Sequence, residues 1–355
     1  MTIDRTTILS GIKTFTPNLI STLLFESNFE ANTTHDNFAA NGVQDQMSGT
    51  DLTTGFTWPT AQPSFPNGGD GQALNCNWSV IYLGHKFATL SPANVGNYAV
   101  VDFPTMTGPD GSTGRALHLN LKDTGQIDHV SHVNQPFGGQ LDLMFNRVSD
   151  NTNPLPPLLG DVYFSYWCKR PGALSAQIPN VNDSAVQVDF KTGGWYDGTK
   201  NQYGGGFRTV LHIVRMQDGS LRWRAIADNG ANGGMTTDPS GILPFNAVSP
   251  NKIYWYETHK TAPVTLDAWF KVEGYIHMHE SKGICLFAID DQIICHHIGR
   301  TKDEFGLPWG RIMPILMYSQ GGPCEGWFWN IIIRDYPPSN SVLYAPAAID
   351  LYRLA

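Results

Sequence analysis

Hydrophobic and polar residues alternate along most of this chain, and a period of two predicts β-strands rather than helices. Gly, Pro, Asn and Asp separate the alternating runs at short intervals, as expected for turns. No long run with helical periodicity interrupts them. The predicted strands cover residues 23–30, 98–103, 115–121, 129–133, 140–145, 162–169, 185–191, 207–216, 221–227, 253–257, 269–299 (with two turns), 311–318 and 327–334.

Residues 269–299 contain the clearest consecutive antiparallel strands. A turn at 281–283 and a second turn at 290–291 divide them. Strand geometry places alternate side chains on opposite faces, so Phe270, Val272, Ile276 and Met278 share an apolar face. The opposite face carries Trp269, Lys271, Glu273, Tyr275, His277 and His279. A strand of this kind is expected in a sheet that lines a polar cleft.

About a dozen short strands separated by turn signals predict an all-β fold, a two-sheet antiparallel jelly-roll sandwich. We expect a single domain over residues 23–336, because no repeat or clear linker divides it. Residues 1–22 are expected to form an N-terminal arm, and residues 337–355 an extended C-terminal tail. The Asn-, Gly- and Thr-rich stretch 31–98 predicts long loops.

The overall charge limits the classes of partner. With 23 Lys and Arg against 31 Asp and Glu, the formal net charge is −8, which argues against nucleic acid as a general partner. No apolar run reaches membrane-spanning length, and the N-terminus lacks the pattern of a signal peptide. We therefore expect synthesis in the cytoplasm. The ten Trp residues suit both β packing and sugar stacking.

The cysteines and one glycine-rich segment raise the questions of a disulfide and of a metal. The five Cys residues include no C-x-x-C pair, so we predict no zinc or redox site. Cys285 and Cys295 flank the turn at 290–291; they are either free core thiols or one disulfide. The segment Gly69–Gly71 is either a plain turn or part of a calcium loop, although it lacks the ligand spacing of an EF-hand.

Several segments together resemble the concanavalin-A-like jelly roll of polysaccharide lyases, laminarinases and related lectins. They are Gly114–Leu119, Val162–Trp167, the hairpin Gly283–Ile294 and the closing strand Trp329–Ile333. The similarity spans about residues 112–336. It implies the two-sheet fold and a polysaccharide or other glycan as partner.

Within this family, jelly-roll alginate lyases carry the strand motif Y-F-K-A-G-x-Y-x-Q. The segment Trp269–His277 keeps its Lys and Tyr in register, so the resemblance implies Tyr275 as acid/base and Lys271 as a carboxylate ligand. Glu273 and Trp269 lie on the same predicted face and are candidate substrate-binding residues.

A second lyase motif, Gln-Ile-His, corresponds here to Gln187–Asp189. Gln187 is a candidate substrate-binding residue. Asp189 stands at the His position, where its negative charge would repel a uronate carboxylate.

A further candidate pair joins two predicted strands. His212 shares a predicted strand face with Arg208, and related lyases use a His and a Tyr from neighbouring strands. His212 with Tyr275 or His277 is therefore a candidate catalytic pair, and Arg208 a candidate ligand for an acidic sugar. The alternative is a hydrogen-bonded histidine with a structural role.

Two functions remain open at this stage. The first is a non-catalytic jelly roll that binds carbohydrate or assembles with other subunits through its terminal arms, such as a decoration, tail or adhesion protein of a phage or virus particle. The second is a polysaccharide lyase that cleaves an acidic polysaccharide by β-elimination. A glycoside hydrolase is disfavoured, because no run of the form Glu-x-Asp-x-x-Glu supplies its paired carboxylates.

Overall fold

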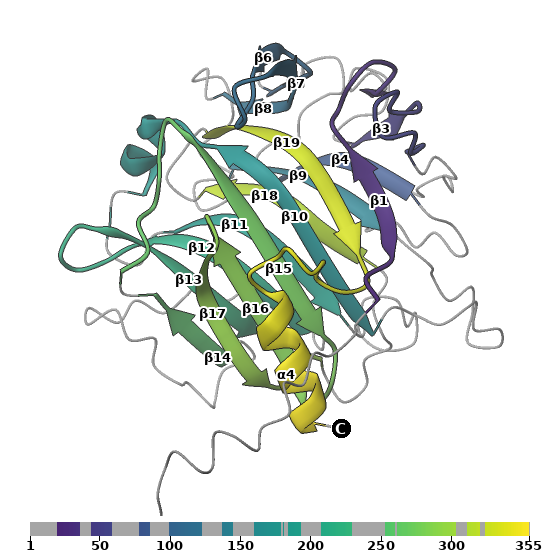
Figure 1. Cartoon of the computed structure of the whole chain (residues 1–355). Coiled ribbons are helices and arrows are strands. Elements are labelled where there is room, and N and C mark those ends of the chain that lie inside the picture. Colours follow the sequence, from purple (N-terminus) through teal and green to yellow (C-terminus); the bar gives the residue numbers. More distant parts are fainter. Residues whose placement is uncertain are drawn as a thin grey trace, which may run out of the picture.

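A computed structural model of the chain shows two antiparallel sheets packed face to face (Figure 1). The structure describes residues 20–35, 44–58, 78–85, 99–122, 137–144, 160–178, 180, 184–192, 207–228, 253–259, 261–302, 311–319 and 324–354.

The first sheet has eight strands, in the order β17, β16, β15, β10, β19, β8 and β5, and β1 pairs with β19 beside this path. Its strands are β1 (Leu23–Ser27), β5 (Ala99–Asp102), β8 (Leu117–Leu121), β10 (Asp161–Lys169), β15 (Trp269–His277), β16 (Gly283–Ile289), β17 (Gln292–Gly299) and β19 (Cys324–Arg334).

The second sheet has nine strands, in the order β14, β13, β12, β11, β18, β9, β4, β3 and β2. These are β2 (Thr34–His35), β3 (Gln44–Ser48), β4 (Trp78–His85), β9 (Phe137–Met144), β11 (Ser184–Thr192), β12 (Phe207–Arg215), β13 (Leu221–Asp228), β14 (Ile253–Thr258) and β18 (Arg311–Ser319).

The chain crosses repeatedly between the two sheets. After β10 in the first sheet it forms β11–β14 in the second, returns for β15–β17, and then places β18 and β19 in opposite sheets. This path confirms the predicted all-β antiparallel jelly-roll sandwich. Two smaller elements lie outside the two sheets: the hairpin of β6 (Thr105–Thr107) with β7 (Thr113–Arg115), and the 3₁₀ helix η1 (Gly172–Gln177).

One hydrophobic core fills the space between the sheets. Leu211 and Ile213 of β12 belong to it together with Val272 and Ile276 of β15, and all four are at most 1% exposed. Alternate residues of the same strands therefore point outward, and each sheet has an outer face on the far side from the core. The outer face of the eight-stranded sheet faces the viewer in Figure 1.

The C-terminal segment differs from its expected extended form. Residues Tyr344–Leu354 form the helix α4, which lies across the outer face of the eight-stranded sheet (Figure 1). Leu343 and Ala347 are fully buried there against Tyr163 and Tyr275, so they form a small second hydrophobic cluster. Apolar residues at 343, 347 and 351 recur at helical spacing, and this short pattern indicates the helix in retrospect.

Several sequence predictions concern residues outside the described part of the chain, namely the arm at 1–19, the glycine-rich segment 69–71 and the strand at 129–133. Cys285 and Cys295 are buried free thiols, as in the first of the two alternatives. Within the described residues no helix is long and apolar enough to cross a membrane.

Candidate functional site

The polar face of β15 points outward from the sandwich, as the alternation predicts. Lys271, Glu273, Tyr275 and His277 lie on this outer face, since the residues between them belong to the core or, at Gly274, face it. Antiparallel pairing with β10 sets Tyr163 opposite Tyr275. The outer face therefore carries a ladder of polar and aromatic side chains across these two strands.

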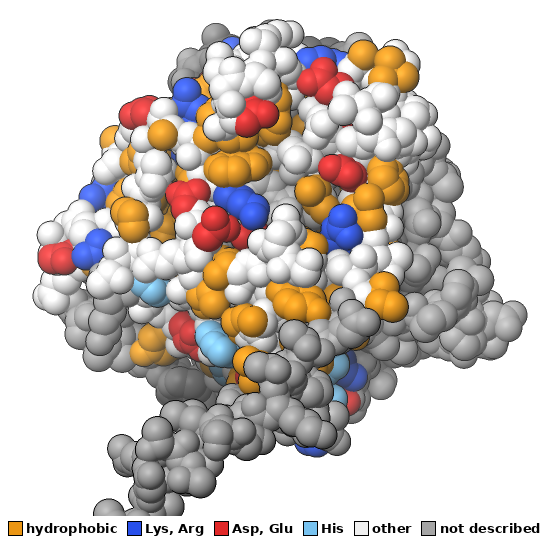
Figure 2. Space-filling view, in the orientation of Figure 1, with side chains coloured by type: hydrophobic (Ala, Val, Ile, Leu, Met, Phe, Trp, Pro, Cys, Tyr) orange, Lys and Arg blue, Asp and Glu red, His pale blue; other side chains and the backbone are white. Residues whose placement is uncertain are grey.

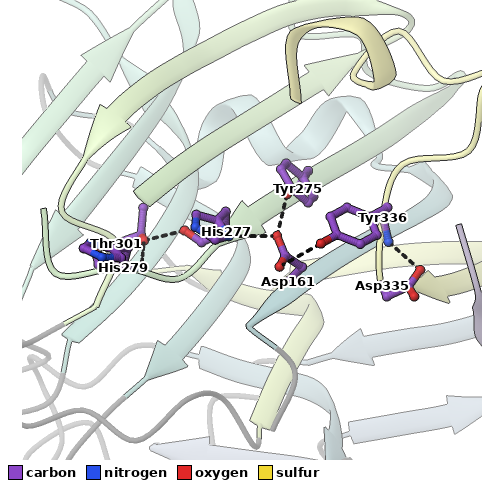
Figure 3. A network of polar contacts seen from close by, with 7 residues as sticks. All are labelled: Asp161, Tyr275, His277, His279, Thr301, Asp335 and Tyr336. Atoms are coloured by element: carbon purple, nitrogen blue, oxygen red, sulfur yellow. Dashed lines mark hydrogen bonds and ion pairs between the residues drawn. The ribbon is translucent and has the colours of Figure 1, made fainter. Parts of the chain in front are cut away.

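Asp161 at the start of β10 is the centre of a polar network (Figure 3). Its Oδ1 accepts a hydrogen bond of 2.5 Å from the hydroxyl of Tyr275 and lies 2.9 Å from Nδ1 of His277. Its Oδ2 accepts a longer bond of 3.3 Å from the hydroxyl of Tyr336, which follows β19. One carboxylate thus joins β10 and β15 to the segment that leads into α4.

Tyr275 is fully buried in this network, although it lies on the outer face. Burial and the neighbouring Asp161 carboxylate both raise the pKa of its hydroxyl far above the ordinary value. The same two causes raise the pKa of Tyr336 to about 12. A tyrosine that gives up its proton in catalysis needs the opposite shift, so the geometry assigns Tyr275 a structural hydrogen bond.

Glu273 is also covered, at 1% exposure, and it has three partners. Its Oε1 accepts hydrogen bonds of 2.6 Å from Tyr163 and 2.7 Å from Ser341. Its Oε2 lies 3.1 Å from Nζ of Lys271. Lys271 keeps a quarter of its side chain exposed and lies 3.7 Å from Asp291 as well. Of the predicted substrate-binding residues on β15, Glu273 is closed off and Lys271 remains accessible.

His277 is the accessible member of the Asp161 network, with 25% of its side chain exposed. Its Nδ1 faces the carboxylate, which leaves Nε2 as the nitrogen that can meet a ligand. The ring of His279 stacks beside it at 6.5 Å between centroids. Thr301 fixes the backbone of both histidines, since its hydroxyl donates 2.6 Å to the carbonyl of His277 and accepts 3.0 Å from the amide of His279 (Figure 3).

His212 and Arg208 lie far from this network, on the outer face of the nine-stranded sheet. Leu211 and Ile213 on either side of His212 face the core, so His212 points away from β15. Burial, with Arg208 and Arg224 nearby, lowers the pKa of His212 to about 3. Arg208 holds Asp228 through two hydrogen bonds of 2.5 and 3.0 Å.

Gln187 occupies a third location, inside the sandwich. It is fully buried, and its amide nitrogen donates 3.1 Å to the hydroxyl of Tyr166. The structure therefore distributes the predicted site residues over two outer faces and the core. The convergence of Lys271, Tyr275 and His212 that the lyase hypothesis requires does not occur.

A row of aromatic and charged side chains that the sequence reasoning missed crosses the other half of the same outer face. Register pairs place Asp102, His118, Trp327, Lys169 and Trp269 opposite one another on five neighbouring strands. The ring of His118 stacks on Trp327 at 4.9 Å, and Nζ of Lys169 lies 5.9 Å from the centroid of the same indole. The period-two spacing of Trp327 and Trp329 in the sequence was the signal for this row.

Trp167 lies next to this row, between two lysines. Lys169 follows it on the same face of β10, and Lys271 is its register partner on β15. Trp167 is half-buried, and its indole N–H has no hydrogen-bond partner among the described residues. Figure 2 shows this face, on which Lys, Arg, Asp and Glu side chains lie together near the centre with hydrophobic side chains around them.

Trp269 and Trp329 are held in place by the β6–β7 hairpin. The indole N–H of Trp269 donates 3.0 Å to the carbonyl of Thr107. Gly108 and Gly114 allow close approach to Trp329, because a Cβ at either position would lie within 2.8 Å of its ring. Trp269, a predicted substrate-binding residue, therefore lies under the hairpin at the edge of the exposed surface.

Metal ligation has no support in the described part of the chain, which contains no cluster of three or more His, Cys, Asp or Glu side chains able to hold an ion. The calcium alternative concerns residues 69–71, outside that part.

No family model matches this chain, and no curated protein matches its sequence. Among solved structures it is similar to an alginate lyase from Chlorella virus, with 11% identity, 68% of this chain and 94% of the other covered, and a TM-score of 0.36. It is similar to an alginate lyase mutant in complex with an alginate tetrasaccharide, with 12% identity, 61% and 80% covered, and a TM-score of 0.37.

A third similar structure is the GlcNAcα1-4Gal-releasing endo-β-galactosidase from Clostridium perfringens, with 10% identity, 88% of this chain and 62% of the other covered, and a TM-score of 0.41. Likenesses this low carry over no activity. The sheet topology of this chain is what shows its fold, an antiparallel jelly-roll sandwich that resembles the concanavalin-A-like one.

Proposed function

We propose that this protein binds an acidic glycan, without cleaving it, on the outer face of the eight-stranded sheet. The observation that carries the proposal is the position of Trp167 between Lys169 and Lys271 on an outward-facing surface. A half-exposed indole offers an apolar surface for the C–H groups of a sugar ring, and its N–H offers a donor at the edge. The ammonium group of Lys169 supplies positive charge for a carboxylate or sulfate of the sugar, and Lys271 can donate hydrogen bonds beside it.

The charge of Lys169 is available to a ligand. Among the described residues Lys169 has no carboxylate partner, and its contact is with the Trp327 ring. The ammonium group of Lys271 lies within ion-pair distance of two carboxylates, those of Glu273 and Asp291. Lys169 therefore presents one ammonium group beside the indole without a carboxylate partner among the described residues, and this local charge supports contact with the acidic group of a sugar.

The positions of the candidate catalytic residues do not support a lyase reaction at this surface. A β-elimination needs a base, an acid and a group that neutralises the carboxylate within reach of one sugar. Here Tyr275 is closed off with a raised pKa, and His212 lies on the other sheet. Non-catalytic binding requires only an exposed surface with suitable side chains.

Isothermal titration with oligosaccharides of alginate, of glucuronan and of a neutral glucan tests the proposal. We expect binding of an acidic oligosaccharide, and a loss of about tenfold or more in affinity with Trp167→Ala, since each factor of ten corresponds to about 1.4 kcal/mol. Lys169→Met should weaken binding and reduce its salt dependence. The matched control Lys302→Met, a lysine that pairs with Glu280, should bind as the unmodified protein does. Affinity unchanged by Trp167→Ala would overturn the proposal.

A lyase remains the second candidate because of one specific contact, the 2.9 Å approach of His277 Nδ1 to Asp161. A histidine oriented by a carboxylate is a competent general base, and a quarter of this side chain is exposed. Ultraviolet absorbance of unsaturated uronate, measured over a panel of acidic polymers, separates the two functions. Cleavage that His277→Ala abolishes would establish the lyase and refute binding alone.

A further inference from the structure

Arg170 is a charged side chain fully enclosed between the two sheets. It follows Lys169 at the end of β10, and its relative exposure is 0%. Strand alternation sets it on the inward side, in line with Tyr166 and Cys168. Arginine is almost never fully buried unless it is paired, so its surroundings need an explanation.

The hydrogen bonds of Arg170 leave one edge of its guanidinium group empty. Nη1 donates a long bond of 3.5 Å to Oε1 of Gln187. Nε and Nη2 are buried and have no partner. The amide nitrogen of Gln187 is a donor and cannot accept from arginine; it faces the Tyr166 hydroxyl at 3.1 Å and Sγ of Cys168 at 3.4 Å. Nε–H and one N–H of Nη2 form the side-on fork that arginine uses for anions.

Among the described residues no negative charge compensates Arg170. No carboxylate of the described residues lies within ion-pair distance of Arg170. Its titratable neighbours Cys168 and Cys324 are buried thiols, and burial raises the pKa of each to about 12, so both stay neutral at pH 7. The hydroxyl of Tyr166 is held neutral in the same way. An enclosed cation without a counter-charge is costly for a folded protein.

We propose that the Nε–Nη2 edge of Arg170 binds a small inorganic anion of the halide class inside the sandwich. An anion satisfies both free N–H groups and the charge, whereas a water molecule satisfies only the N–H groups. The stem of the arginine is closely packed, since a Cβ on Gly326 would lie 2.8 Å from Sδ of Met317 and 3.2 Å from Cδ of Arg170. Among common anions a monatomic halide needs the least room.

Thermal unfolding at constant ionic strength tests the site, with sodium chloride or bromide exchanged for sodium methanesulfonate. Because an anion that binds only the folded state stabilises it, we expect the Tm to rise by a few degrees and to saturate as halide replaces methanesulfonate. Arg170→Met keeps the length of the side chain without its charge and should remove the halide dependence. Arg222→Met, at a half-exposed arginine, should retain it. Equal Tm values in both salts, or a halide response unchanged in Arg170→Met, would overturn the proposal.

Crystals of the unmodified protein grown in bromide provide a second measurement, which stands even where Arg170→Met does not fold. We expect an anomalous peak within hydrogen-bond distance of Nε and Nη2 of Arg170. A peak at that position supports the anion site. Ordinary water density without anomalous signal there refutes it.

Discussion

Tyr275 on β15 and His212 on β12 point away from each other, with both sheets and the core between them. Each side chain is buried on its own outer face, and each has a pKa shifted away from neutral. The two residues therefore contribute to stability through separate contacts, and each makes a separate prediction.

Tyr275→Phe removes the hydrogen bond to Asp161 and should lower the free energy of unfolding by about 1–3 kcal/mol, the usual range for a buried bond to a charged group. Urea unfolding measures this loss. Tyr336→Phe should cost less, because its bond to the same carboxylate is 3.3 Å long and the ring is more exposed. Glycan affinity should stay unchanged in both variants. If a stably folded Tyr275→Phe variant lost glycan binding, or lost an activity of the unmodified protein, Tyr275 would be a functional residue.

His212 should make the protein sensitive to acid. Its folded-state pKa of about 3 lies below the ordinary 6.5, so below pH 6.5 the unfolded chain takes up a proton that the folded protein does not. The resulting stability is present above pH 6.5 and falls by about 1.4 kcal/mol per pH unit as the pH drops towards 3. His212→Gln should reduce this slope in urea unfolding between pH 7 and pH 4. An identical slope in the variant would show that His212 is protonated in the folded state.

Gly274 should tolerate no side chain. It lies on the core side of β15, where a Cβ would come within 2.1 Å of the Phe164 ring. Gly274→Ala should therefore lower the free energy of unfolding by about 1–3 kcal/mol through overpacking. Gly160→Ala is the matched control, because nothing lies within 4 Å of its Cβ position. Equal stability of the two variants would mean that the two strands have room to separate.

The packing of α4 on the sheet is tested by one pair of substitutions. Leu343→Ala removes a fully buried side chain from the cluster beneath the C-terminal segment and should cost about 2–5 kcal/mol. Leu343 immediately precedes α4, and Ile349→Ala, at a residue 44% exposed within the helix, should change stability by about 0.5 kcal/mol or less. Urea unfolding of both variants provides the comparison. A small loss for Leu343→Ala would indicate that α4 is only loosely attached.

The sequence predicted most of the strands because alternation is a local signal, but it was wrong to expect only long loops over 31–98, where the structure has β2, β3 and β4. Residues 162–169 were expected in a strand that the structure begins at Asp161, and the outward row of β15 was identified residue by residue. Alternation also predicted the class of fold, since many short antiparallel strands have few ways to bury their apolar faces.

The alternation of residues along one strand could not show which distant segment covers the outer face of the sheet. The polar row of β15 predicts a cleft, yet the C-terminal segment, more than sixty residues further along the chain, covers Tyr275 through Leu343 and Ala347 and Glu273 through Ser341. Nor could one sequence show that β12 and β15 belong to different sheets, because that depends on contacts between distant segments. The arm at 1–22, with its expected role in assembly, stays a prediction, since residues 1–19 lie outside the described part of the chain.

The pairing of β10 with β19 slips by one residue at Asn330, whose φ of 49° marks a β-bulge. Trp327 and Trp329 before it point outward, whereas Ile331 and Ile333 after it point into the core, although all four have odd numbers. Deletion of Asn330 would reverse the face to which the side chains of one half of β19 point. Either the two indoles would then point into the core, or the two isoleucines would point into water. The single extra residue in β19 thus allows one strand to contribute apolar side chains to the interior and indoles to the outer surface.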